Sequence, residues 1–533
     1  MSIENDPAEP VGDSTETRAG LSRRTIMKGA AWTVPALMVA TSAPMAAASC
    51  WPGGTIFNSH GLGKFLSGTI GNQNLDLLAS INAAKADTPG PATPQHVVDF
   101  NSLDVSVLSA INVDLSGTGA LLSDLLGFLV PANTGVYNQY AMADSNGQSI
   151  GASGLVSNNG VIDTGAAAGN VDVGSLDLKV ILESLVGSSL GGALSNVSDL
   201  KLKAGAVGGR AFVDNTNCTP GNDDIVTRDY LLAYLRLLIK SNVVGALSTA
   251  LNTALSNLTI STSAVWALLQ GVPLLGGLLA ALGQNALNVS VSVNTGGLTG
   301  PIPSASGKAL QINLQQGELL LDLGALLGGA YTGNVTPFLN NRPANTRLFV
   351  DAGLPVNALS DTLDAWVNSL IDALKPLISI TISAGSVSGF GATGLLIQGS
   401  LGDFLGGTAT AEFKLLGNTI DLGGLLNGLV GGVGTLVVDA IKALFAPSGV
   451  LNSVWAPVNT LLSGIFTILQ NVLVLTVNAQ NAPTNGGGRP IPLPLQGLPT
   501  GRYDVAALHI GLVQTALLNL LLARGSVGPN LPR

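Results

Sequence analysis

The sequence predicts an α+β protein in which β-rich sheet or sandwich layers carry inserted Leu-rich apolar helices. Hydrophobic residues make up 46% of the 533 residues and charged residues only 10%, so the chain can bury a large core. Aromatic residues are 4%, which leaves Leu, Val, Ala and Ile to fill that core. A strand-like segment, a Leu-rich segment and a second strand-like segment recur in loose form. Their lengths are too unequal for a solenoid repeat.

A twin-arginine export signal is predicted over residues 1–48. The pair Arg23-Arg24 precedes a short apolar run that ends in small residues, which is the order of a signal peptide. The run is too short to span a bilayer comfortably. The string SRRTIMK follows the pattern S-R-R-x-F-L-K, with Ile and Met in place of Phe and Leu. We expect cleavage between Ala48 and Ser49; a basic turn before a buried helix is the alternative.

Two cysteines remain after that cleavage, Cys50 and Cys218. Thiols outside the cell tend to oxidise, so a disulfide between them is one expectation. Lipidation of Cys50 is a second, although Ala47 stands where lipoprotein signals usually carry Leu. A free thiol is the third. Two cysteines this far apart make no zinc site by themselves.

Residues 49–225 are predicted to form an N-terminal β-rich region. Leu and Ile residues recur at helical spacing and predict a short helix at about 74–86. Residues 97–118 mix apolar and polar positions, which fits strands or a short helix. The Asn146-Gly147 pair lies between two strand-like segments and predicts a β-hairpin.

Residues 226–480 are predicted to mix strands with apolar helices. The clearest helix lies within residues 358–377, where apolar residues share one face. These residues are Leu359, Leu363, Trp366, Val367 and Leu370. Residues 481–500 are rich in Gly and Pro and are predicted to be a linker or a long loop. Residues 501–533 follow as a C-terminal strand segment without an anchor motif.

Two stretches carry no charged residue, 241–307 and 443–488. Three interpretations compete: buried helices of a large core, a surface for self-association or a partner, and membrane insertion. Gly and Pro interrupt both stretches, and neither contains 18 consecutive apolar residues. The sequence therefore predicts no transmembrane span in the mature chain.

No catalytic, cofactor-binding or metal-binding residue is predicted. His60, His96 and His509 are far apart in sequence, and none has a metal-ligand spacing. His509 lies in an apolar pattern, and we expect it to face solvent from a strand. The G-x-S-x-G match at 187–191 lies inside a Leu-rich segment, whereas a nucleophile elbow requires a preceding strand and a following helix.

One loop is rich in oxygen ligands. Asp214, Asp223, Asp224 and Asp229 crowd residues 214–229, and such loops bind calcium weakly outside cells. The spacing does not match an EF-hand, so a solvated loop is the simpler interpretation.

The charge balance argues against nucleic acid as a partner. Removing residues 1–48 leaves 19 basic and 27 acidic side chains, a net charge of −8. Nucleic-acid phosphates require clustered Lys and Arg, and the sequence has no basic patch interleaved with aromatic residues.

Five stretches, taken in order, carry a resemblance to a known family. They are GKFLSGTIGNQNLDLLASINAAKA at 63–86, NSLDVSVLSAINVDL at 101–115, QYAMADSNGQSIGASGLVSNNGVI at 139–162, RDYLLAYLRLLI at 228–239 and GRYDVAALHIGLVQTALLNLLLARGSVGPN at 501–530. With them the chain resembles the choice-of-anchor G family of exported bacterial surface proteins. The resemblance implies a Gram-positive surface protein without enzymatic activity. The family's varied C-terminal anchors are not matched after residue 530, so we expect release, or retention by apolar surfaces or a lipidated Cys50.

These observations predict an exported, non-enzymatic structural or adhesive protein of the cell surface or extracellular space. Self-association and cell-envelope components are the expected partners, because a low-charge, apolar composition suits assembly through apolar faces and open sheet edges. An extracellular carrier of apolar ligands is one alternative and requires a deep apolar cavity. An extracellular hydrolase is the other and requires paired carboxylates in one cleft.

Overall fold

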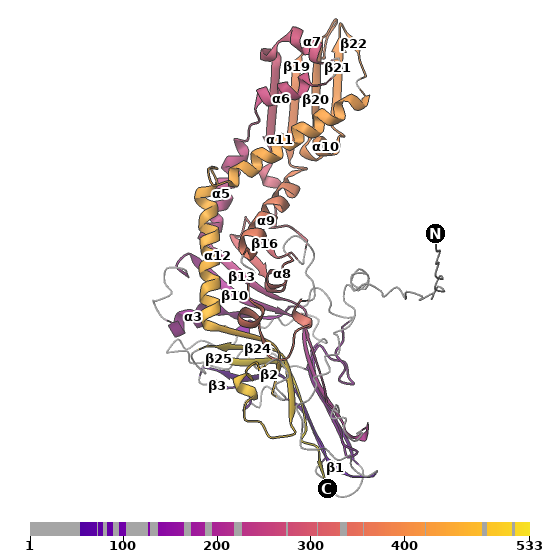
Figure 1. Ribbon diagram of the computed structural model, residues 1–533, viewed down its shortest axis with the longest axis vertical. Helices are drawn as coiled ribbons and strands as arrows, with labels where there is room; N and C mark the ends of the chain where they lie inside the picture. The colour runs from indigo at the N-terminus through magenta and orange to yellow at the C-terminus, as the bar shows by residue number, and fades with distance from the viewer. Residues whose placement is uncertain are drawn as a thin grey trace, which may run out of the picture.

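The computed structural model describes residues 54–71, 73–77, 83–88, 95–102, 126–127, 137–164, 172–186, 194–217, 226–272, 275–305, 308–330, 338–354, 357–421, 423–481, 488–513 and 518–533. Its fold is α+β, with several antiparallel sheets and inserted apolar helices, as predicted. The molecule is elongated (Figure 1). Two packed sheets form a base at one end, a five-stranded sheet lies at the other, and long helices connect them.

The base is built on a sheet that joins the two ends of the described chain, which we call the terminal sheet. Its order is β18-β23-β24-β25-β2-β3, with β4 also paired to β2. The strands are β2 (His60–Ile70), β3 (Gln73–Asn74), β4 (Ala84–Asp87), β18 (Thr346–Arg347), β23 (Leu473–Gln480), β24 (Tyr503–Leu512) and β25 (Leu518–Val527). A short pair, β1 (Phe57–Asn58) with β26 (Leu531–Pro532), extends this closure.

A second sheet, which we call the cover sheet, packs on one face of the terminal sheet. Its order is β12-β11-β8-β7-β5. The strands are β5 (His96–Ser102), β7 (Asn138–Asp144), β8 (Gln148–Gly154), β11 (Val207–Asp214) and β12 (Val226–Leu232). The predicted hairpin is present as β7 and β8, and Gly147 of its turn has a φ of 96°.

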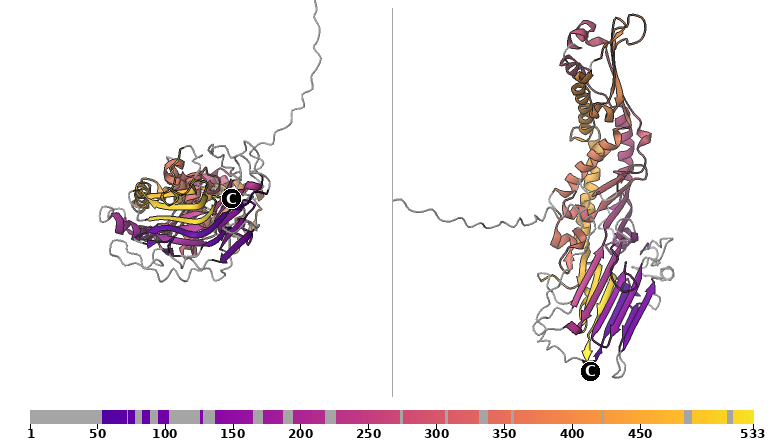
Figure 2. Two further views of the ribbon diagram at one scale, coloured as in Figure 1. Left: turned by 90° about the horizontal axis from the view of Figure 1, so that it is seen from below. Right: turned by 90° about the vertical axis from the view of Figure 1, so that its right-hand side faces the viewer.

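Glycines let the two base sheets approach unusually closely. A Cβ on Gly61 would lie 2.3 Å from the carbonyl oxygen of Ile150, and one on Gly151 would lie 2.2 Å from that of Ser526. A Cβ on Gly525 would likewise lie 2.2 Å from the carbonyl oxygen of Gly151. Sheets separated by full side chains stand about 10 Å apart. Here backbone faces backbone, so the base is thin and leaves little room for rearrangement (Figure 2).

A middle sheet links the base to the rest of the molecule, in the order β15-β16-β17-β13-β10-β9-β6. Its strands are β6 (Leu126–Gly127), β9 (Asp172–Asp177), β10 (Val197–Gly205), β13 (Leu235–Ser241), β15 (Pro301–Ile302), β16 (Leu310–Asn313) and β17 (Glu318–Asp322). β10 continues into β11, and β12 continues into β13. The Gly205 N–H donates to Tyr234 O at 2.9 Å at the point where these two strand pairs pass from the middle sheet into the cover sheet.

The described residues between β13 and β23 form a helical arm and a distal module, apart from β15, β16 and β17 of the middle sheet and β18 of the terminal sheet. The arm and its approaches contain α5 (Asn242–Ser256), α8 (Leu323–Gly328), α9 (Ala358–Leu374), α11 (Asn427–Phe445) and α12 (Asn452–Val472), while α3 (Leu178–Val186) packs on the middle sheet. The predicted helix is present as α9, whose buried face includes Leu363, Trp366 and Leu370. Short turns of helix complete the set, among them η6 (Phe338–Asn340), η7 (Leu348–Ala352) and η9 (Leu493–Leu495).

The far end of the arm carries a sheet that we call the distal sheet, in the order β14-β19-β20-β21-β22. Its strands are β14 (Leu287–Val293), β19 (Ile378–Gly385), β20 (Gly394–Ser400), β21 (Thr410–Leu415) and β22 (Asn418–Thr419). Around it lie α6 (Thr262–Gln270), α7 (Leu275–Leu282), α10 (Leu401–Gly406) and α11, as Figure 1 shows. The face of the distal sheet that points away from these helices exposes hydroxyl and amide side chains: Asn288, Ser290, Ser292, Ser379, Gln398 and Thr410.

The uncharged stretches lie largely in these helices and strands. α5 buries Leu247, Leu251 and Leu255, and it packs against α12. Their buried side chains belong to the main hydrophobic core. Among the described residues, one helix, α11, is long and apolar enough to cross a membrane by length and composition alone, and 39% of its most apolar window is buried.

Two local predictions were wrong. The helix expected at about 74–86 is not formed across that range, because residues 84–87 are strand β4. Ala84 and Ala86 alternate with exposed or half-buried neighbours, and this two-residue period belongs to an edge strand. His509 was expected to face solvent, but it is only 4% exposed. It lies in β24, an internal strand whose residues are all buried.

Candidate functional site

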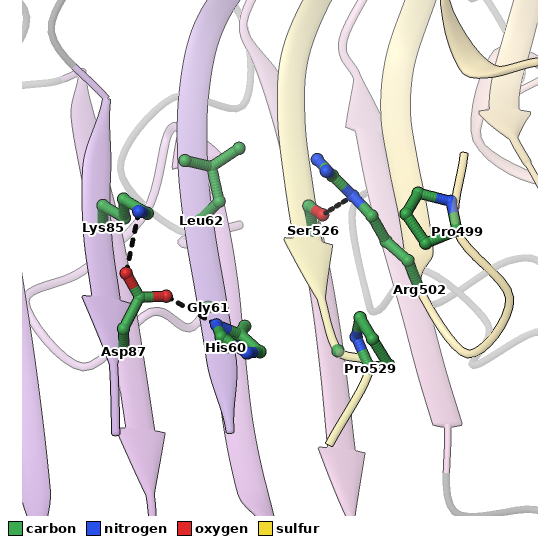
Figure 3. Close-up of a pocket in the computed structure, with 10 residues that line it drawn as sticks. His60, Gly61, Leu62, Lys85, Asp87, Pro499, Arg502, Ser526 and Pro529 are labelled. Carbon is green, nitrogen blue, oxygen red and sulfur yellow. Dashed lines mark hydrogen bonds and ion pairs between the residues drawn. The ribbon is translucent and has the colours of Figure 1, made fainter. Parts of the chain in front are cut away.

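A cleft of about 280 Å³, lined by both charged and apolar residues, opens in the terminal sheet (Figure 3). It lies where strands from both ends of the described chain meet, because β2 pairs with β4 on one side and with β25 on the other. The segment that leads into β24 forms the remaining wall. The lining residues are His60, Gly61, Leu62, Lys85, Asp87, Pro499, Arg502, Ser526, Gly528 and Pro529.

One wall carries a hydrogen-bonded group of three charged or titratable side chains. The β2–β4 register places His60 directly opposite Asp87. His60 Nδ1 lies 2.7 Å from Asp87 Oδ1, and Lys85 Nζ lies 2.8 Å from Asp87 Oδ2. Partial burial acts to raise the pKa of Asp87, but the hydrogen bonds and charges of Lys85 and His60 outweigh it and lower the pKa. Asp87 is therefore a stable carboxylate at neutral pH, and it orients His60.

The opposite wall is organised by a buried carboxylate, Asp504, which is fully buried. Arg524 Nε donates to Asp504 Oδ2 at 2.6 Å, and Ser526 Oγ donates to Oδ1 at 2.8 Å. Arg502 Nε donates both to Asp504 Oδ1 and to Ser526 Oγ, at 3.0 Å each. Charge-assisted bonds of this kind are short and directional. Because Arg502 is held through Nε, its two outer amino groups are left at the cleft (Figure 3).

A further arginine adds positive charge behind this wall. Arg228 of the cover sheet is only 2% exposed, and its guanidinium lies 5.8 Å from the ring centroid of Tyr503. Burial lowers the pKa of Arg228 to about 10, although Tyr503 and Asp504 act to raise it. Arg228, Arg502 and Arg524 thus surround one carboxylate, and the local charge is positive.

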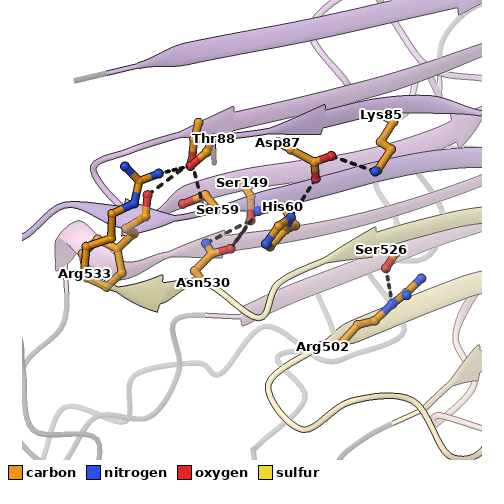
Figure 4. A network of polar contacts seen from close by, with 11 residues as sticks. Ser59, His60, Lys85, Asp87, Thr88, Ser149, Arg502, Ser526, Asn530 and Arg533 are labelled. Carbon is orange, nitrogen blue, oxygen red and sulfur yellow. Dashed lines mark hydrogen bonds and ion pairs between the residues drawn. The ribbon is translucent and has the colours of Figure 1, made fainter. Parts of the chain in front are cut away.

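The residues that follow β25 hold His60 and the strands around it in place (Figure 4). The His60 N–H donates to Asn530 Oδ1 at 3.2 Å, and Asn530 Nδ2 donates to Gly147 O at 2.9 Å. Arg533 hydrogen-bonds Asn58 and the carbonyl of Thr88. Through Asn530, the backbone of His60 in the terminal sheet is tied to the β7–β8 turn of the cover sheet.

The chemistry of the cleft suits an oxyanion. Lys85 and Arg502 present N–H donors, with His60 beside them, whereas the lining contains one carboxylate, Asp87, which Lys85 already neutralises. A carboxylate, phosphate or sulfate group can accept such bonds. Among the residues that the structure describes, no group of three or more His, Cys, Asp or Glu side chains has the geometry of a metal site.

The residues of the predicted export signal and the two cysteines lie outside the described ranges. Arg23, Arg24, Ala48 and Ser49 of the export signal are among them, and so are Cys50 and Cys218. The signal, its cleavage point and the disulfide stay predictions.

The proposed calcium loop is described only at its two ends. Asp214 Oδ1 accepts the Thr216 N–H at 3.0 Å, and Asp229 Oδ2 accepts from Arg210 at 3.1 Å. Asp223 and Asp224 lie outside the described residues. The two placed carboxylates therefore already have partners of their own.

The cleft residues were not predicted as a site. His60 had been considered only as one of three scattered histidines. One signal was available: Arg502 and Asp504 are two residues apart, as are Arg524 and Ser526, in otherwise apolar segments. Residues two apart on a strand share a face, so polar pairs of this kind indicate a polar patch on a buried sheet.

Comparisons with known proteins add a family but no function. No curated protein and no solved structure matches the chain. A family described as "Domain of unknown function (DUF8394)" matches residues 61–528, which run from strand β2 to the end of β25 and include the arm and the distal sheet. Because this match covers most of the sequence, the chain belongs to the DUF8394 family.

Proposed function

We propose that this protein is an exported, non-enzymatic structural or adhesive protein of the bacterial cell surface or extracellular space. The observation that carries the proposal is its shape. A thin base, closed by strands from both ends of the chain, supports an arm that projects the distal sheet away from it (Figure 1). A spacer that holds one contact surface at a distance from another suits adhesion. The resemblance to choice-of-anchor G proteins and the twin-arginine signal support the same location.

The distal end offers a contact surface. Phe390 is fully exposed and Leu416 is 74% exposed, in two loops of the distal sheet. The loops are joined, because the Gly417 N–H donates to Ala392 O at 2.8 Å and the Leu416 N–H donates to Thr393 Oγ1 at 3.1 Å. Neither loop segment, 386–393 or 415–418, contains a charged residue. Exposed apolar side chains on a braced, uncharged tip are suited to a partner surface.

The adhesive role is tested by changing the tip alone. The double variant Phe390→Ser/Leu416→Ser should bind isolated cell envelopes at least about tenfold more weakly than the parent chain, with an unchanged melting temperature, because both side chains are exposed. Val450→Ser is the matched control, since Val450 is 69% exposed but lies between α11 and α12. Equal binding by the parent, the double variant and the control would show that the tip does not contribute to adhesion.

The location is tested through the signal. Replacing Arg23 and Arg24 by Lys should leave the chain inside the cell, because the twin-arginine route reads the arginine pair. Fractionation into cytosol, membrane, wall and medium shows the result. Continued export of the double-lysine variant would contradict this route, and a wild-type chain that stays in the cytosol would contradict the surface role itself.

A hydrolase remains the second candidate, favoured by one observation. Asp87 orients His60 as a carboxylate orients a catalytic imidazole, with 2.7 Å between Oδ1 and Nδ1. The nearest hydroxyl of the lining, Ser526, is already bonded to Asp504 and Arg502. Hydrolysis of an envelope polymer that is lost in both His60→Ala and Asp87→Asn would favour this candidate over a purely adhesive role.

The carrier alternative has less support. It requires a deep apolar cavity bounded by residues 241–307 or 443–488. In the described part of these stretches, the apolar side chains of α5 and α12 pack into the main core. The cleft described above lies in the base and is lined by no residue of either stretch.

A further inference from the structure

Strand β14 forms an open edge of the distal sheet. It pairs with β19 on one side, and no described strand pairs with it on the other. The Asn294 N–H donates to Leu377 O at 2.9 Å, which continues the β14–β19 register by one residue. Backbone groups alternate in direction along an antiparallel strand. The N–H and C=O groups of Val289, Val291 and Val293 therefore point toward the open edge.

This edge lacks the sequence features that usually prevent strand pairing. Natural edge strands are protected by charged side chains, proline, bulges or very short length. β14 has seven residues, with no charged residue and no proline, and its pairing with β19 is regular throughout. Its three valines are only partly buried against the core. The strand thus offers unpaired backbone groups beside half-covered apolar side chains.

The sequence of β14 is nearly symmetric about its centre. Read in both directions from Ser290, the strand has Val at 289 and 291, Asn or Ser at 288 and 292, and Leu or Val at 287 and 293. If two copies paired antiparallel about Ser290, valine would face valine on the apolar face. On the polar face Ser290 would face Ser290 and Asn288 would face Ser292, and no charges would be opposed.

We propose that the partner of this edge is a second copy of the same chain, paired antiparallel through β14 with Ser290 at the two-fold axis. The outward backbone groups of Val289 then bond to those of Val291 in the second copy. The Leu287 C=O accepts the Val293 N–H of the second copy, since the Leu287 N–H already donates to Gln284 O. The two five-stranded distal sheets become one continuous sheet, and their hydroxyl-rich faces become one surface. Such an interface is isologous and closes with two chains.

The β14 dimer would account for the self-association expected of a structural protein. It rests on the proposed function only for where in the cell the dimer would act. Export and adhesion are tested in cells and on envelopes. Strand pairing is tested in purified protein, so the failure of one does not decide the other.

Crosslinking tests the register. In the proposed pair Ser290 faces its own copy at a non-hydrogen-bonded position, where Cα atoms lie about 4.5 Å apart, within reach of a disulfide. Ser290→Cys should form a disulfide-linked dimer under mild oxidation. In Ser292→Cys each cysteine faces Asn288 of the second copy, so the two cysteines are offset by four residues, about 13 Å, along the strand. They should not form a disulfide. The unsubstituted chain controls for Cys50 and Cys218.

Charge tests the interface without a covalent bond. Ser290→Lys places two ammonium groups opposite each other and should raise the dimer dissociation constant by about tenfold or more in sedimentation velocity. Gln398→Lys, exposed on the same face but in an internal strand, should not. Mixing Ser290→Lys with Ser290→Glu should restore dimers. The proposal is overturned if the parent chain stays monomeric at high concentration, if both cysteine variants crosslink equally, or if Ser290→Lys dimerises like the parent.

Discussion

His509 shows how burial in the terminal sheet sets the protonation state of a single side chain. Its Nε2 lies 3.3 Å from Asn519 Oδ1, and its Nδ1 is buried without a hydrogen-bond partner. Burial lowers the pKa of His509 to about 4, although the hydrogen bond to Asn519 acts to raise it. The folded protein therefore keeps this imidazole neutral at pH values where an unfolded chain would protonate it, since the ordinary pKa is about 6.5.

This difference makes stability depend on pH. Between pH 6.5 and 4 the unfolded chain binds a proton that the folded chain does not, so the free energy of unfolding falls as the pH falls. We expect a loss of about 2–3 kcal/mol from His509 between pH 7 and 4.5. Urea unfolding at both pH values should show a smaller loss for His509→Gln than for the parent chain. The same loss in both proteins would mean that other groups set the pH dependence.

At the scale of elements, local sequence patterns predicted the helices and turns that are determined by residues close together in the chain. The 3.6-residue spacing of Leu363, Trp366 and Leu370 predicted α9, and Asn146-Gly147 predicted the β7–β8 hairpin. The helix predicted at about 74–86 from the spacing of its Leu and Ile residues was extended into β4. Alanine fits both structures, and the pairing with β2 makes this segment a strand. Pairing partners far away in sequence are the information that periodicity lacks.

The glycines of the base show what such patterns cannot predict. Glycine is frequent throughout this chain, and nothing near Gly151 in sequence distinguishes it from the helical Gly245. In the fold, a Cβ on Gly151 would lie 2.2 Å from Ser526 O and 2.3 Å from Leu62 O, whereas a Cβ on Gly245 meets nothing within 4 Å. The same substitution should therefore have opposite effects at the two positions.

Gly151→Ala should force the terminal and cover sheets apart and destabilise the protein by about 3 kcal/mol or more. Gly245→Ala lies inside α5 and should stabilise it by up to about 1 kcal/mol, because alanine is the better helix former. Denaturant unfolding of the two variants and the parent gives the comparison. If Gly151→Ala were as stable as the parent, the close backbone packing described for the base would be incorrect.

At the scale of the whole molecule, the cleft and the arm both depend on long-range closure. His60 and Asp87 come from the start of the described chain, and Arg502 and Ser526 come from its end. The sequence shows polar residues at two-residue spacing at β24 and β25, but their position beside His60 could not be predicted from it. The antiparallel pairing of β2 with β25 alone brings them together.

The direction of the arm depends on a joint of three aromatic side chains from α9, α11 and α12. Trp366 stacks on Trp455 at 5.3 Å between ring centroids, and Phe445 packs edge-on against both, at 6.3 and 5.2 Å. Trp366 is 1% exposed, and its Nε1 donates to Ile302 O at 2.9 Å. The joint thereby ties all three helices to the strand at the edge of the middle sheet.

Trp366→Ala should open a cavity at this joint and cost about 3–5 kcal/mol, while the base and distal sheets keep their own strand pairing. Below its melting temperature, the variant should show a broader distribution of particle dimensions in small-angle X-ray scattering, because the arm is no longer fixed to the base. Trp366→Phe keeps an aromatic ring but loses the hydrogen bond to Ile302, and it should lose only about 1–2 kcal/mol while retaining the parent scattering profile. An alanine variant with parent-like scattering and stability would show that backbone connections alone hold the arm, and a spacer role would then not depend on this joint.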